Sequence, residues 1–116
     1  MLALALVFTP RPAISAELVM VEESFCEWCE LWNEEIGVVY AKTEEGERAP
    51  LRRVEMRSAE MKAMTFKMRV QYTPTFILME DGAEVGRIEG YPGEDFFWGM
   101  LQGLLKKLPA TDAATQ

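Results

Sequence analysis

The sequence contains no histidine and only two cysteines in 116 residues. The absence of histidine excludes histidine-based acid–base catalysis, cysteine–histidine hydrolysis and most transition-metal sites. Basic residues are also few, 12 against 19 acidic ones, and the formal net charge is -7. Because phosphate contacts need a basic face, nucleic acid is not expected as a partner. The 49% hydrophobic and 27% charged residues are typical of a globular protein, and the length suits one small domain.

Residues 1–16 differ in composition from the rest of the chain. Residues 2–8 are apolar, Pro10 and Pro12 end this run, and Ala16 is a small residue suited to signal cleavage. The apolar run is too short to span a bilayer. We therefore predict a cleaved export signal over residues 1–16, with an N-terminal strand or arm as the alternative. The basic segment that usually precedes such a run is missing, so the true N-terminus and the cleavage site stay open.

The two cysteines, Cys26 and Cys29, are separated by two residues and follow an apolar run at 18–21 that predicts a buried strand. Cys29, Trp32 and other apolar residues then recur at helical spacing, which predicts a helix beginning at or beside Cys26. Residues i and i+3 share a helix face, so the two sulfurs can meet. The free N–H groups of the first turn would stabilise a thiolate at Cys26. This layout is typical of a dithiol redox site.

A cysteine pair of this kind has two other possible uses. A zinc site needs four ligands, and the chain has neither a third cysteine nor a histidine. A permanent structural disulfide would close a loop too small to add much stability. Working thiols are therefore the preferred interpretation, with no metal and no cofactor beyond the Cys26–Cys29 disulfide itself.

The patterns along the chain predict the order β-α-β-α-β-β-α. This order predicts an α/β fold with a mixed four-stranded sheet flanked by helices on both faces, the first strand internal and the second at an edge. The folded domain is expected over 17–109 and a disordered tail over 110–116. Strands are expected at 17–21, 51–56, 75–79 and 85–88, with a hairpin turn at Asp81-Gly82 between the last two. Helices are expected at 26–40 and 94–108, and a solvated loop at 42–48. Arg52 and Arg53 should lie at the sheet edge, and Ser58 should cap a short helix with Met61, Met64 and Met68 as core filling.

Two motifs at set places in this order carry a family resemblance. Cys26-Glu27-Trp28-Cys29 after the first strand, with Thr73-Pro74-Thr75-Phe76 opening the third, resembles the thioredoxin superfamily in its minimal form. The segment 90–98, Gly-Tyr-Pro-Gly-Glu-Asp-Phe-Phe-Trp, together with the predicted export signal, resembles more narrowly the periplasmic thioredoxins of bacterial sulfur-oxidation (Sox) operons. The narrower resemblance implies a periplasmic location.

The resemblance implies roles for residues around the dithiol. Pro74 should follow a cis peptide bond, and the backbone of Thr73 should pair with an extended partner segment. The sequence leaves the place of Trp98 open between core and surface. Thioredoxins also bury an aspartate on the strand before the dithiol; Met20 occupies that position here, and Glu22 and Glu23 nearby are interpreted as a solvated strand end. The predicted partner-binding residues are Phe25, Trp28, Thr73, Pro74, Gly90 and Tyr91.

The expected chemistry is thiol–disulfide exchange. Cys26 should be the attacking thiolate and Cys29 the thiol that resolves the mixed disulfide. Glu27 should tune the potential towards a reductant, because its charge opposes the thiolate by a few tenths of a kcal/mol up to about 1 kcal/mol. The pKa of Cys26 is accordingly expected nearer to about 7 than to the value of about 3.5 found in strong oxidants.

The leading functional prediction is a periplasmic thiol–disulfide reductase acting on a protein disulfide. The Sox resemblance implies that a Sox carrier protein is the client and that a membrane thiol transporter is the electron donor. We expect a monomer. The alternatives are an oxidase or isomerase of exported proteins, and a regulatory module that binds a Sox component without turnover.

Overall fold

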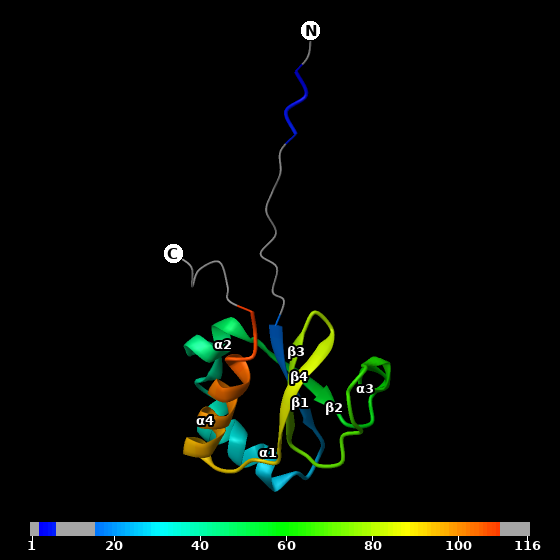
Figure 1. Cartoon of the computed structure of the whole chain (residues 1–116). Coiled ribbons are helices and arrows are strands. Elements are labelled where there is room, and N and C mark those ends of the chain that lie inside the picture. Colours follow the sequence, from blue (N-terminus) through cyan, green and yellow to red (C-terminus); the bar gives the residue numbers. More distant parts are fainter. Residues whose placement is uncertain (1–2, 7–15, 110–116) are drawn as a thin grey trace.

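The computed structural model describes residues 3–6 and 16–109 (Figure 1). Most of the predicted export signal and all of the predicted tail lie outside these residues. Ala16, the last residue of the predicted signal, is the first residue of a strand and is buried, with Glu80 opposite it in the sheet. Within the described residues, no helix is both long and apolar enough to cross a membrane.

The sheet has four strands in the order β2-β1-β3-β4. β1 runs parallel to β2 and antiparallel to β3, and β3 and β4 form a hairpin. The predicted Asp81-Gly82 turn is present, and both residues have positive φ, which glycine adopts without a steric cost. The predicted fold class, with an internal first strand and an edge second strand, is therefore confirmed. The strand bounds are Ala16–Glu22 for β1, Leu51–Glu55 for β2, Thr75–Glu80 for β3 and Ala83–Glu89 for β4.

Helices cover both faces of this sheet (Figure 1). α1, α2 and α4 lie on one side and α3 on the other. The single helix predicted at 26–40 is interrupted: after α1 the chain forms a π-helical turn and then a 3₁₀ turn. The bounds are Glu27–Trp32 for α1, Asn33–Gly37 for the π turn η1, Tyr40–Lys42 for the 3₁₀ turn η2, Glu44–Arg48 for α2, Ala59–Ala63 for α3 and Glu94–Leu105 for α4.

The solvated loop predicted at 42–48 is wrong, because the chain forms α2 there. Thr43 caps this helix: its Oγ1 accepts a hydrogen bond from the Gly46 N–H at 3.0 Å and donates one to the Tyr40 carbonyl at 2.6 Å. Gly46 is buried, and a Cβ at this position would lie 1.9 Å from the Tyr40 carbonyl oxygen. Close backbone contact therefore requires glycine in a segment whose charged composition resembles a loop.

We expect Gly46→Ala to lower the free energy of unfolding by about 1–3 kcal/mol, since the backbone must shift to admit the new methyl group. Urea denaturation followed by circular dichroism measures this loss. Gly103→Ala is the matched control, because a Cβ there meets no atom within 4 Å. That variant should gain roughly 0.5–1 kcal/mol from helix propensity alone. Equal effects of the two substitutions would contradict the role of close contact.

The core has two parts, one on each face of the sheet. The larger part lies under α1 and α4. There the ring of Trp32 packs against Phe76 and Phe97, with ring centroids 5.1 and 5.8 Å apart, respectively. On the opposite face, Met61 and Met64 pack over the valines of β1, as predicted. Met68 does not take part: it lies beyond the short α3 helix and its side chain is 58% exposed.

A buried ion pair anchors the segment that leads to Pro74. The side chains of Glu84 and Arg87, both on β4, are 3% and 7% exposed and lie 2.8 Å apart. Glu84 accepts a hydrogen bond from the Lys67 N–H at 2.9 Å, and Arg87 donates to the Met68 carbonyl at 2.8 Å. The pair thus fixes residues 67–68, for which no helix or strand is formed, against the hairpin.

Candidate active site

Cys26 and Cys29 form a disulfide at the start of α1. Cys26 is the N-cap residue of this helix, and its Sγ accepts a hydrogen bond from the Cys29 N–H at 3.1 Å. A sulfur at this place is therefore stabilised by a helical N–H group in the way expected for a thiolate. Cys26 is half-buried, whereas Cys29 is only 3% exposed and packs in the larger core. An incoming partner can reach Cys26 more easily than Cys29.

The residues next to the dithiol present apolar side chains to solvent. Phe25 has a φ of 62° and is fully exposed, and Trp28, between the two cysteines, is 57% exposed. Glu27 is also exposed, in the first turn of α1. The β1–α1 connection and the first helical turn therefore form an accessible surface around Cys26.

The segment at Pro74 lies beside this surface. The peptide bond between Thr73 and Pro74 is cis. Thr73 Oγ1 donates a hydrogen bond to Glu23 Oε1 at 2.7 Å, which joins this segment to the connection that carries the dithiol. The Gly90 N–H donates to the Pro74 carbonyl at 2.8 Å. These two hydrogen bonds place Thr73, Pro74 and Gly90 next to the connection that carries Cys26. A partner-binding role for these residues, and for Phe25 and Trp28, stays a prediction.

Tyr91 does not lie on this surface. Its side chain is buried, and its hydroxyl donates a hydrogen bond to Glu35 Oε1 at 2.7 Å, so it ties the chain after β4 to η1. Burial, and then the hydrogen bond to Glu35, raise the pKa of Tyr91 above its usual value. The predicted docking role of Tyr91 is corrected to a structural one.

Trp98 is half-buried and stacks on Tyr40, with the ring centroids 6.1 Å apart.

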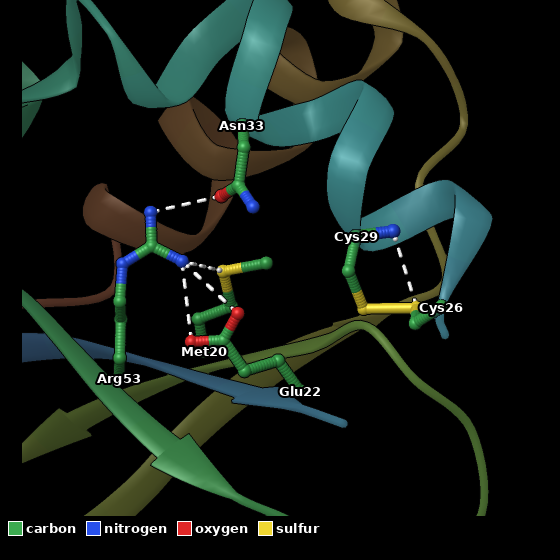
Figure 2. Close-up of polar contacts among 6 residues, drawn as sticks. All are labelled: Met20, Glu22, Cys26, Cys29, Asn33 and Arg53. Atoms are coloured by element: carbon green, nitrogen blue, oxygen red, sulfur yellow. Dashed lines mark hydrogen bonds and ion pairs between the residues drawn. A yellow bond between two sulfur atoms is a disulfide. The ribbon is translucent and has the colours of Figure 1, made fainter. Parts of the chain in front are cut away.

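A cavity of about 510 Å³ opens beside the disulfide. Figure 2 shows the polar cluster at this cavity, in which the guanidinium of Arg53 binds Glu22, Asn33 and the sulfur of Met20. Sequence reasoning placed Arg53 at a solvated sheet edge and missed this cluster. The available signal was the parallel pairing of the first two strands, since Met20 lies opposite Arg53 in the sheet. The residues around the cavity are Glu22, Glu23, Ser24, Phe25, Cys26, Cys29, Glu30, Asn33, Arg53 and Glu55.

The polar side chains of the site do not form a metal centre. In the part of the chain that the structure describes, no three histidine, cysteine, aspartate or glutamate side chains are grouped so that they could hold a metal ion. The group that can change its redox state is the disulfide.

Comparisons with known proteins agree with this geometry. A family model described as a thioredoxin-like domain matches residues 16–104. The crystal structure of the periplasmic thioredoxin SoxS from Paracoccus pantotrophus, in its reduced form, is 43% identical, with a TM-score of 0.75, over 79% of this chain and 97% of that one. No curated protein sequence matches at a significant level.

More distant solved structures share the fold. Fasciola hepatica thioredoxin is 24% identical with a TM-score of 0.58, covering 76% of this chain and 79% of that one. The oxidised thioredoxin of Plasmodium falciparum is 16% identical with a TM-score of 0.61, covering 77% and 80%. The family match over most of the chain and the placement of the disulfide lead to one conclusion. This chain belongs to the thioredoxin-like family and is a thiol–disulfide oxidoreductase, in which the Cys26–Cys29 disulfide serves as the redox group in place of a cofactor.

Proposed function

We propose that this protein is exported to the periplasm and acts mainly as a reductant of protein disulfides or mixed disulfides. Its client in this proposal is a thiol of the sulfur-oxidising (Sox) system, and a membrane thiol transporter supplies the electrons. The observation that carries the proposal is the 43% identity to the periplasmic thioredoxin SoxS over 97% of that chain. The exposed surface around Cys26 supports it, because a protein client needs access to one sulfur.

The reaction follows from the different exposure of the two sulfurs. In the reduced protein, the thiolate of Cys26 attacks a sulfur of the client disulfide and forms a mixed disulfide, releasing one client thiolate. Cys29 then loses its proton and attacks Cys26. The Cys26–Cys29 bond forms, the bond to the client breaks, and the second client sulfur leaves as a thiolate. Two electrons pass to the client in total, and the protein ends in the disulfide form seen in the structure.

Client docking is assigned to the exposed residues around Cys26. Phe25 and Trp28 offer apolar contact area. The backbone of Thr73, next to the cis Pro74, is proposed to pair with an extended client segment. Gly90 supports this strand end through its bond to the Pro74 carbonyl. We propose that the protein acts as a monomer, since a second copy over this surface would block the client.

Acidic residues at the start of α1 favour a reductant. Glu27 and Glu30 lie in its first turn, and its last turn carries no basic residue. Negative charge near the helix N-terminus opposes the Cys26 thiolate. It therefore destabilises the reduced form relative to the disulfide and lowers the reduction potential. An exposed charge of this kind contributes at most about 1 kcal/mol, which is about 20 mV for a two-electron couple.

We expect Glu27→Gln to raise the reduction potential by about 5–20 mV, because removing the charge stabilises the reduced form with its thiolate. Equilibration of the protein with glutathione or dithiothreitol mixtures measures the potential. Glu47→Gln is the control, since Glu47 is exposed on α2 and should leave the potential unchanged. The parent protein should lie well below about −150 mV, and a higher value would favour the oxidase or isomerase function instead.

A further inference from the structure

The proposed reaction leaves one proton without an acceptor. Cys29 must lose its proton to resolve the mixed disulfide, yet its side chain is 3% exposed and packs in the larger core. Burial among apolar groups disfavours a free thiolate. At the position where thioredoxins bury an aspartate, this chain has Met20. Its side chain is fully buried and carries no ionisable group. The acceptor must therefore come from the cavity beside the disulfide.

Glu22 is the candidate acceptor of the Cys29 proton, because side chains along β1 alternate between the two faces of the sheet. Side chains two residues apart in a strand point to the same face, so Met20 and Glu22 both face α1. Glu22 is the next residue on that face towards the dithiol. Figure 2 shows its carboxylate on the side of Arg53 that faces Cys29. The Glu22 side chain is 25% exposed and lines the same cavity as Cys29.

Arg53 holds the Glu22 carboxylate in this place. One guanidinium nitrogen donates to both carboxylate oxygens, at 3.1 and 3.2 Å. Another nitrogen of the same group donates to Asn33 Oδ1 at 2.8 Å. The guanidinium also lies 5.8 Å from the centre of the Trp32 ring. These contacts join β1, β2 and the helix that carries Cys29, so the carboxylate is fixed with respect to the dithiol.

The other charged groups at the cavity are less suited than Glu22 to accept the Cys29 proton. Glu23 Oε1 accepts the hydroxyl hydrogen bond of Thr73, and Glu55 Oε2 accepts one from the Arg57 N–H. Glu30 lines the cavity, but it is exposed in the first turn of α1. Arg53 is the one cation among the cavity residues. On its other side, Cys29 faces the larger core cluster, whose buried members are all hydrophobic.

We propose that Glu22 accepts the proton of Cys29 across the water-accessible cavity, and that Arg53 is the positioning residue for Glu22. This inference rests on the proposed reaction. As the Cys29 sulfur attacks Cys26, its proton passes to the Glu22 carboxylate and from there to solvent or to the departing client thiolate. The bond from Cys26 to the client breaks as the Cys26–Cys29 bond forms. No further oxidant or reductant is needed.

The reaction of the reduced protein with 5,5′-dithiobis(2-nitrobenzoate) tests this step in a stopped-flow instrument. The first release of chromophore reports attack by Cys26 and depends on reagent concentration. The second release reports resolution by Cys29 and does not. At pH 7 we expect Glu22→Gln to slow the second phase by about 10- to 100-fold, within or just below the usual range for general base catalysis. Its rate should then rise in proportion to hydroxide, whereas that of the parent protein should be flatter.

The first phase is the internal control, and it should stay within about twofold because Cys26 needs no help from Glu22. Glu30→Gln makes the same charge change at the same cavity and should leave the second phase unchanged. Arg53→Met should slow the second phase less than Glu22→Gln, since the carboxylate remains but is no longer fixed. A purely electrostatic role of Glu22 predicts the opposite sign, because removing a negative charge favours the thiolate.

The inference is overturned if Glu22→Gln leaves the second phase within twofold of the parent rate or accelerates it, or if Glu30→Gln slows it equally. If Glu22→Gln does not fold, Arg53→Met decides the question by the same criterion of the second phase. These outcomes are separate from the proposed function. A high reduction potential would refute the reductant role and leave the two-phase result standing. The second phase measures only the step in which Cys29 loses its proton, and in the reverse step Glu22 would return that proton to the leaving Cys29 thiolate.

Discussion

Replacing Cys29 with serine is expected to trap the client on Cys26. The variant keeps the exposed nucleophile but lacks the thiol that resolves the mixed disulfide, so the reaction stops after the first exchange. A periplasmic extract incubated with the reduced variant should give a covalent adduct on a non-reducing gel, and mass spectrometry of the adduct should identify the client. Disulfide reduction with turnover should fall to the uncatalysed level.

The control for this experiment is the double variant with serine at both Cys26 and Cys29. It should form no adduct, and dithiothreitol should release the client from the single variant. A regulatory module that binds without turnover would instead retain the same partner in all forms and show no covalent species. Adducts with many exported proteins, and none with a Sox component, would support an oxidase or isomerase.

Breaking the Glu84–Arg87 pair should have the largest effect on stability. Glu84→Gln leaves the Arg87 charge buried without its partner, and loss of one member of a buried pair costs about 3–5 kcal/mol. The loss should appear as a lower midpoint in urea denaturation. Because the pair also fixes residues 67–68 ahead of Pro74, reduction of a protein client should weaken together with stability.

The same pair predicts a pH dependence. The hydrogen bond from Arg87 holds the pKa of Glu84 below its usual value. A depressed carboxyl pKa contributes stability that is present above the unfolded-state pKa of about 4.3 and lost as the pH falls through the lower folded-state value. Unfolding free energies measured from pH 7 down to pH 3 should therefore fall less steeply for Glu84→Gln than for the parent protein. Glu47→Gln, at an exposed position on α2, should stay within about 0.5 kcal/mol of the parent and keep its slope. Parallel pH profiles for Glu84→Gln and the parent protein would show that the pair does not contribute in this way.

Local patterns were enough to predict the frame of this protein. The spacing of Cys26 and Cys29 before a helical repeat placed the dithiol at a helix entrance, and the structure has the disulfide there. Short apolar runs and the Asp81-Gly82 turn predicted the strands and the hairpin. These features depend on residues within a few positions of one another, so a single sequence contains the information.

Contacts between distant residues were decided only by the tertiary structure. Tyr91 resembled a docking residue until its hydrogen bond to Glu35, 56 positions away, placed it in the core. Arg53 resembled an edge charge until the parallel pairing of β1 and β2 brought it to Glu22 and Asn33. The short α2 helix likewise depends on the contact of Gly46 with the Tyr40 backbone. By itself the sequence determined which sulfurs react and on which kind of fold. The tertiary structure decided which charges surround them, because a polar side chain acquires its partner only when separate strands and helices pack together.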